Sequence, residues 1–286
     1  NNLRSSDCNQ QGYLRFDEFD EFVNKYNRDY SHDYLERLHI FSENMKYIDY
    51  MNNEDNGLTF EMNEFGDYTP HEFDMYFKGY NVSNFLGKTR SCKTFTGTEM
   101  VEEEYWDWRD MGAVTSVKNQ GQCGSCWSFS TTGALEGAYY IKYGKLESFS
   151  EQQLVSCDNF QHGGKDHGCN GGLMDNAFMW IEKNGGLCLE TDYPYTSGDT
   201  KSAEACETTC SIVSNSEITN YVDVESNSDE AMMMALNKQP VSIAIQADQK
   251  DFQLYKSGVF TGTCGTKLDH GVLVVGHGSS DGEDYY

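Results

Sequence analysis

The most reactive stretch of the sequence runs from Gln120 to Phe129 and contains two cysteines, Cys123 and Cys126, in a C-x-x-C pair. This spacing occurs in redox pairs, in halves of zinc sites, and where a structural cysteine neighbours a reactive one. The residues from Cys126 onward are patterned as a helix. A thiol in the first turn of a helix has a lowered pKa, because unpaired backbone N–H groups and the helix dipole favour the thiolate. Cys126 is therefore a candidate nucleophile.

The redox and zinc interpretations have less support. A redox pair is expected near a β-α-β unit, whereas the residues before Cys123 are patterned as helices. A zinc site needs about four ligands, usually in pairs, and the sequence has no second C-x-x-C. Further ligands would have to come from a scattered set: His162, His167, Cys169, Cys206 and Cys210.

A thiolate nucleophile needs an imidazole partner, which can lie far along the chain. His270 stands at the start of an apolar run and His277 at its far end. Either could be structural, but the start of a strand fixes the backbone, so we prefer His270. The remaining histidines lie in the N-terminal segment or in a Gly/Asp-rich loop: His32, His39, His71, His162 and His167.

The composition excludes several classes of protein. The 286 residues include 46 acidic and 21 basic ones, a net charge of −25, which argues against nucleic acid as a partner. A hydrophobic content of 38%, with 14% aromatic residues, is enough for a folded core. A membrane-spanning helix needs roughly 18–20 consecutive apolar residues, and no such run is present. The ten cysteines indicate an oxidising compartment, reached through the secretory pathway.

The two ends suggest an incomplete record. Asn1 is neither a start methionine nor part of an apolar signal segment, so we expect that an N-terminal part has been removed or that the sequence is a fragment. The last residue, Tyr286, follows soon after the apolar run Val272–Val275, with no cap or turn between.

The elements that must position these residues follow from hydrophobic periodicity. Steps of three or four residues predict helices over 16–52, 126–143 and 173–183. Gly144 is a C-terminal stop for the second of these. Alternation predicts strands over 241–246 and 271–276. A helix-rich portion therefore precedes a strand-rich one, which predicts an α+β fold. Residues 78–104 have the polar composition of a linker that proteases cut.

Several separated motifs resemble one family. Cys123–Trp127 fits the pattern C-G-[SA]-C-[WY], with a histidine at the appropriate distance. Cys169–Asp175 and Asp269–Val272 resemble the cleft and catalytic-histidine segments of the same family. The chain thus resembles the zymogen of a papain-family cysteine protease of the cathepsin L-like branch. The resemblance implies a two-lobed fold with a helical lobe and a β-barrel-like lobe, incomplete at the C-terminus, behind a helical propeptide domain.

The N-terminal segment resembles cathepsin L-type propeptides. Six positions fit the interspersed helix motif, with Asp in place of the usual Glu at the first: Asp33, Arg37, Phe41, Asn44, Ile48 and Asn52. Asn63, Phe65 and Asp67 resemble a second motif, in which Glu61 replaces a common Gly. The resemblance implies an inhibitory domain over 1–77, a tail and activation linker over 78–104, and a peptidase domain over 105–286. The tail of such a propeptide runs through the cleft against the substrate direction.

The resemblance also implies the chemistry. Cys126 is the nucleophile and His270 its base, resting as thiolate and imidazolium, and Gln120 helps the Cys126 backbone N–H to bind the oxyanion. An extended peptide lies along Gly171 and Gly172. Further cleft positions, mostly apolar, predict a hydrophobic residue second from the cleavage point: Leu173, Met174, Ala244, Leu268 and Asp269. No metal or cofactor is implied.

The family pattern pairs the cysteines as Cys123–Cys169 and Cys157–Cys206, with Cys188–Cys210 as a plausible extra bridge. Cys264 resembles a cysteine whose partner lies beyond Tyr286, and Cys8 and Cys92 have no assigned partner. Relatives carry the Asn that orients the histidine in an Asn-Ser-Trp segment just past this endpoint. We therefore expect the chain as given to fold poorly and work weakly.

The expected partners are peptide and protein substrates, the chain's own propeptide, and cystatin-like inhibitors. We expect the protein to be a monomer, located in a lysosome or vacuole or outside the cell. The sequon Asn81-Val82-Ser83 could carry a glycan. The alternative is a non-enzymatic protein, either a binding protein or a propeptide-type inhibitor. The retained Cys126, His270 and Gln120 argue against that alternative.

Overall fold

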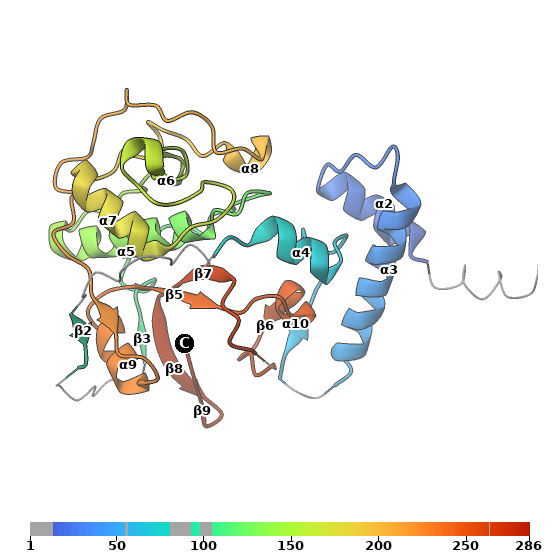
Figure 1. Ribbon diagram of the computed structural model, residues 1–286. Coiled ribbons are helices and arrows are strands. Elements are labelled where there is room, and N and C mark those ends of the chain that lie inside the picture. Colours follow the sequence, from blue (N-terminus) through green and yellow to red (C-terminus); the bar gives the residue numbers. More distant parts are fainter. Residues whose placement is uncertain (1–13, 55–56, 81–92, 98–104, 263) are drawn as a thin grey trace, which may run out of the picture. The chain divides into compact units, whose positions relative to one another are not determined.

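The computed structural model describes residues 14–54, 57–80, 93–97, 105–262 and 264–286. They form two units, shown in Figure 1. The first contains Asn1–Met75 and Ala247–Cys264, and the second contains Tyr76–Gln246 and Gly265–Tyr286. The sequon at Asn81, the cysteines Cys8 and Cys92 and most of the expected linker lie outside the described residues.

Two helices form the core of the first unit. The expected helical region over 16–52 consists of α2 (Phe16–Lys25) and α3 (Tyr34–Met51), which lie side by side in Figure 1. The chain reverses between them at Asn27, which has a positive φ of 49°. The buried contacts between the helices are aromatic and aliphatic: Phe19, Phe22, Leu38 and Phe41. The amphipathic stripe of the sequence is thus the helix–helix interface.

The segment from 247 to 264 completes the first unit, although it is far away in sequence. Strand β1 (Thr59–Phe60) pairs antiparallel with β6 (Tyr255–Ser257), which follows the short helix α10 (Lys250–Gln253). Asn63 Nδ2 donates to the Gln253 carbonyl at 2.8 Å, and Gln253 Nε2 donates to the carbonyl of Phe65 at 2.8 Å. The motif residue Asn63 therefore anchors this segment.

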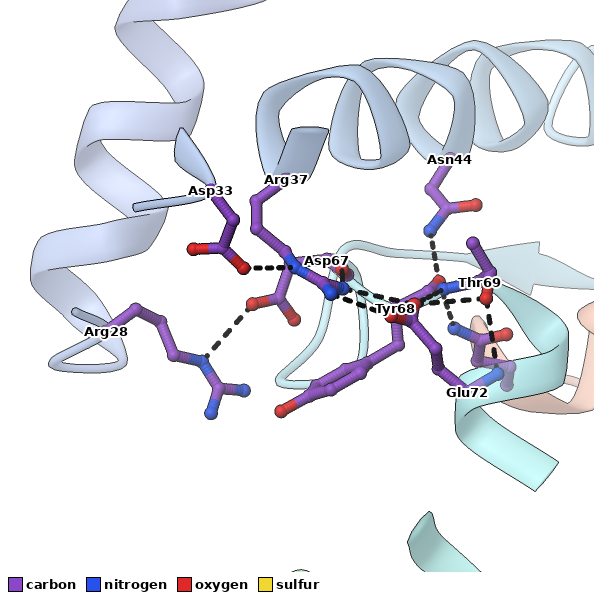
Figure 2. Close-up of polar contacts among 9 residues, drawn as sticks. Arg28, Asp33, Arg37, Asn44, Asp67, Tyr68, Thr69 and Glu72 are labelled. Carbon is purple, nitrogen blue, oxygen red and sulfur yellow. Dashed lines mark hydrogen bonds and ion pairs between the residues drawn. The ribbon is translucent and has the colours of Figure 1, made fainter. Parts of the chain in front are cut away.

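A polar network ties α3 to α4 (Pro70–Phe77), as Figure 2 shows. Arg37 forms a two-point ion pair with Glu72, at 2.7 and 3.0 Å, and also donates to the Asp67 carbonyl. Asn44 Nδ2 donates to the carbonyls of Gly66 and Tyr68 at 2.8 and 3.0 Å. The regularly spaced polar residues of α3 therefore hold the loop that precedes α4.

The helical part of the second unit is built on α5 (Cys126–Tyr143). This helix has the expected bounds, and it ends at Gly144, whose φ of +70° suits glycine. The other helices of this part are α6 (Glu151–Cys157), η2 (Phe160–His162), α7 (Met174–Asn184) and α8 (Ser197–Thr200). Their shared core includes Trp127, Phe149, Leu154 and Ile181, and α5 lies beside α7 in Figure 1.

The strands of the second unit pair mainly antiparallel. Strand β5 (Val241–Ile245) pairs with β7 (His270–Val274), and β8 (Gly276–Ser280) lies between β3 (Trp106–Asp107) and β9 (Glu283–Tyr285). The strand expected over 271–276 is therefore divided at Val275. Strand β2 (Thr94–Phe95) pairs parallel with β4 (Asp223–Val224), and α9 (Asp229–Leu236) follows β4. The described residues contain no closed barrel.

Three disulfides link the second unit: Cys123–Cys169, Cys157–Cys206 and Cys188–Cys210. These are the pairs that the resemblance implied. They also exclude zinc coordination by these sulfurs and a redox pair between Cys123 and Cys126, because Cys123 is bonded elsewhere. Cys264 is a free, exposed thiol. Among the described helices, none is both long and apolar enough to cross a membrane.

Candidate active site

Cys126 occupies the first position of α5 and carries a free, fully buried thiol. The backbone N–H of Gly271, in β7, donates to its Sγ at 3.2 Å. Ser130, one turn along α5, donates its hydroxyl to the carbonyl of Val272 at 2.7 Å. Two contacts therefore hold the start of the helix against the start of the strand.

His270 is the first residue of β7 and lies opposite Ile245 of β5. It is thus the neighbour of Gly271, whose N–H reaches the Cys126 sulfur. Its ring Nδ1 is buried and has no hydrogen-bond partner among the described residues. His277, the other candidate, lies in β8, where its Nε2 is 3.0 Å from Asn237 Oδ1. The fold thus places His270 next along the chain to a residue that contacts the thiol, and it gives His277 a structural partner.

Gln120 lies in the loop before α5, with its side chain directed back toward that helix. Its Nε2 donates to the Cys123 carbonyl at 2.9 Å, which uses one of the two amide N–H bonds. The Tyr195 hydroxyl donates to the Gln120 backbone carbonyl at 2.7 Å and lies 2.7 Å from Ser125 Oγ. Tyr195 therefore fixes the loop, a role that no local pattern in the sequence indicated.

Three residues that precede the peptidase part lie across this thiol. The N–H groups of Gly79 and Tyr80 donate to the Asp269 carbonyl at 3.4 and 3.1 Å. The N–H of Gly172 donates to the Gly79 carbonyl at 2.9 Å, and Tyr80 forms a parallel bridge with Gly172. A Cβ on Gly79 would stand 2.0 Å from the Gly124 carbonyl oxygen, so only glycine fits. The segment Lys78–Tyr80 therefore occupies the cleft.

This coverage reverses the expected ionisation. Burial raises the pKa of the Cys126 thiol to about 12, although N–H groups of Gly271, Trp127 and Gly79 favour the thiolate. Burial, helped by the Lys78 ammonium, lowers the pKa of His270 to about 4. Both shifts oppose the predicted resting thiolate and imidazolium, because loss of water disfavours the charged form of each group. Burial in the covered site therefore favours the neutral thiol and the neutral imidazole.

The expected substrate-binding residues lie mostly together. A Cβ on Gly172 would stand 2.6 Å from the Trp127 ring, and one on Gly271 would stand 3.0 Å from Met174 Sδ. Ala244 pairs with Gly271 in the β5–β7 ladder. Met174 and Ala244 therefore adjoin Gly271, whose N–H reaches the thiol. Of the other expected residues, Leu173 is buried, Gly171 has a φ of +103° and Leu268 is exposed.

Comparison with known proteins agrees with this geometry. Residues 102–286 match the papain family cysteine protease, and residues 19–73 match the cathepsin propeptide inhibitor domain. The chain belongs to the papain family of cysteine proteases. It is a cysteine endopeptidase that carries its own inhibitory propeptide domain.

Relatives and solved structures support the same assignment. The protease is 43% identical over 264 residues to vignain of Ricinus communis, covering 89% of this chain and 70% of that protein. It is 42% identical over 260 residues to a KDEL-tailed cysteine endopeptidase of Arabidopsis thaliana, covering 87% and 69%. A recombinant stem bromelain precursor matches with a TM-score of 0.81 and 35% identity, covering 94% of this chain and 84% of that one.

A buried carboxylate pair supports the cleft of this papain-family protease, and no motif in the sequence indicates it. Asp166 Oδ1 accepts the N–H of Leu173 at 3.1 Å and an N–H of Asn176 at 2.9 Å. Asp158, also fully buried, accepts the N–H of Lys165. Burial raises the pKa of Asp166 to about 6 and that of Asp158 well above its usual range. The pair therefore shares a proton in acid.

Proposed function

We propose that the protease hydrolyses peptide bonds with Cys126 as nucleophile and His270 as general base and acid, once Lys78–Tyr80 has left the cleft. The observation that carries this proposal is the 3.2 Å contact between the Cys126 sulfur and the N–H of Gly271, next to His270, beneath the segment Lys78–Tyr80, the covering strand, which forms a single parallel bridge with Gly172. The strand occupies the place that a substrate needs.

The covering strand explains how the site is held inactive. In the covered state, burial and the Lys78 ammonium keep the imidazole neutral, and burial keeps the thiol protonated. Departure of the strand admits water and removes that positive charge, so a proton can move from Cys126 to His270. The resulting thiolate attacks at acidic pH, where a free thiol with a pKa of about 8.5 would be almost fully protonated.

The chemical steps follow from the positions of the groups. The thiolate of Cys126 attacks the peptide carbonyl carbon, and the Cys126 backbone N–H with the remaining N–H of Gln120 binds the oxyanion. The His270 imidazolium protonates the leaving amine as the C–N bond breaks, which leaves a thioester. Water, deprotonated by His270, then attacks the thioester and releases the acid.

The cleft suits an extended substrate with a hydrophobic residue second from the cleavage point. Gly172 offers its N–H without a side chain in the way, as it does to Gly79 here. Met174 and Ala244 form an apolar wall next to the thiol. The same arrangement supports division into an inhibitory domain (1–77), a tail and linker (78–104) and a peptidase domain (105–286).

The three disulfides support passage through the secretory pathway, to a lysosome or vacuole or to the outside of the cell. The acidic composition suits an acidic compartment. We expect a monomer that binds protein substrates and, in the open state, cystatin-like inhibitors.

Activity of defined variants tests the proposal. The zymogen is expressed as the 286-residue chain and also extended through the Asn-Ser-Trp segment of the family, then activated at pH 5 and assayed with a fluorogenic peptide. Cys126→Ser and His270→Ala should each lower kcat by about a thousandfold or more, with His162→Gln, an exposed loop histidine, as the matched control. Undiminished cleavage by Cys126→Ser would refute the proposal. Equal activity of the two lengths would refute the expected need for the added segment.

A further inference from the structure

The covering strand forms an ion pair with the cleft wall that is not needed merely to keep substrate out of the site. Lys78 Nζ lies 2.9 Å from Asp269 Oδ2, and the two side chains are only 3% and 21% exposed. Removing an ammonium from water costs several kcal/mol unless a partner compensates for the lost hydration. The Asp269 carboxylate therefore forms a cation site, a place in the cleft wall that can bind a buried positive charge.

The position of this place follows from the residues beside it. Gly79 lies over Cys126 and contributes an N–H that favours its thiolate. Tyr80 lies on the Gly172 side, and Lys78 lies on the side of Asp269, which directly precedes His270. Three successive residues of the strand thus mark three successive positions along the cleft.

His270 must stand on the leaving-group side, because it protonates the departing amine in the mechanism proposed above. Asp269 adjoins it, so the cation site lies beside the first residue after the bond that is cut. The strand runs parallel to Gly172, as the bridge with Tyr80 shows. The subsite recognises the Lys78 side chain by its charge and its length. A substrate lysine can therefore be recognised in the same way even if the substrate backbone runs in the other direction.

We propose that Asp269 selects substrates with Lys or Arg directly after the cleaved bond, and that Lys78 occupies this subsite in the zymogen. The inference rests on the proposed function. Two further titratable groups lie near the carboxylate, the Cys126 sulfur, on which its charge acts, and His270, the next residue of the chain. In the open site they form a nearly neutral thiolate and imidazolium pair, which leaves Asp269 as the local acceptor for a substrate cation.

Paired peptides test the selectivity in the activated, extended protease. Internally quenched peptides share a hydrophobic residue second before the cleaved bond and differ only in Lys, Gln or Glu directly after it. We expect kcat/KM for Lys to exceed that for Gln by about fivefold, as for a charge pair at a partly exposed site, with Glu below both. Asp269→Asn should bring the Lys/Gln ratio to about one.

Asp175→Asn provides the matched control. Asp175 is a carboxylate whose charge acts on Tyr80, and burial raises its pKa to about 6, so the variants are compared at pH 7, where its removal should leave the Lys/Gln ratio unchanged. A wild-type ratio near one, or a preference that survives Asp269→Asn, overturns the inference while cleavage itself upholds the proposed function.

A second measurement does not depend on peptide cleavage. Alkylation of Cys126 by iodoacetamide in the intact zymogen reports opening of the strand, and the exposed Cys264 provides an internal reference. Lys78→Gln and Asp269→Asn should each accelerate alkylation of Cys126 severalfold, the double variant no further, and Lys78→Arg should remain slow. Additive effects, or no acceleration, overturn the cation site even if no peptide is cleaved.

Discussion

The ion pair between Arg37 and Glu72 gives the sharpest test of what holds the propeptide domain together. The two side chains are 15% and 20% exposed, and the contact is bidentate. Losing one partner of an exposed pair costs about 0.2–1 kcal/mol and of a buried pair about 3–5 kcal/mol. Glu72→Gln keeps the shape and can still accept the N–H of Thr69, so we expect a cost near 2 kcal/mol between those limits.

The pH dependence of this cost has a definite sign. Burial alone would raise the pKa of Glu72, but hydrogen bonds from Arg37 and Thr69 more than offset it, so the pKa is lowered. A lowered folded pKa means that the stabilisation is present above the unfolded value of about 4.3 and is lost as the pH falls through the folded one. The difference between wild type and Glu72→Gln should therefore be full at pH 7 and become small only at pH values below the lowered folded pKa.

Hydrogen exchange of the whole zymogen measures the local stability of α3 and α4, where the ion pair lies. A loss of about 2 kcal/mol corresponds to roughly thirtyfold faster exchange of the amides that open together. Glu18→Gln is the matched control, because Arg15 and Glu18 form a pair that is 40% and 46% exposed and whose loss should change exchange little. If the two variants exchange alike at pH 7, the network does not stabilise the domain as argued.

Three further predictions concern the peptidase unit. Asp166→Asn should flatten the pH dependence of thermal stability. Because the pKa of Asp166 is about 6 in the folded state against an ordinary 3.8, the wild type should lose about 3 kcal/mol of folding free energy as the pH rises from 4 to 7. Equal melting profiles of both proteins across this pH range would contradict this. Gly172→Ala places a methyl group 2.6 Å from the Trp127 ring, which lies in the core and cannot move away easily. The backbone of the cleft must therefore shift, and KM should rise at least about tenfold. An unchanged KM would contradict the cleft assignment. Gln120→Ala should lower kcat by about 100- to 1000-fold with little change in KM, and a purely KM effect would argue against oxyanion binding.

Features with local causes were predictable from the sequence. The bounds of α5 followed from its hydrophobic pattern and from Gly144, which takes up the left-handed conformation at the helix end. The aromatic stripe of residues 16–52 indicated helical structure. It did not indicate the chain reversal at Asn27, because the stripe is present in the helices on both sides of that residue. The apolar run after His270 indicated a strand, but not its division at Val275, which depends on separate partners for β7 and β8.

Features that depend on distant contacts could not be predicted in the same way. The pKa of Cys126 was expected to fall because only its helix position was visible, whereas burial in the folded chain raises it despite backbone N–H groups that favour the thiolate. The pairing of Lys78 with Asp269 joins residues separated by 191 positions. Asp166 resembles an ordinary loop carboxylate until the fold buries it beneath Leu173. In each case the local sequence lacks the partner that decides the property.

Trapping the acyl-enzyme shows whether the Cys126 sulfur is the nucleophile. The activated, extended protease is mixed with an ester substrate, quenched in acid within one turnover, digested and examined by mass spectrometry. We expect the acyl group on the peptide that contains Cys126, and we expect no such thioester in Cys126→Ser or in the covered zymogen. An acyl group on another residue, or rapid turnover with Cys126 never modified, would contradict it.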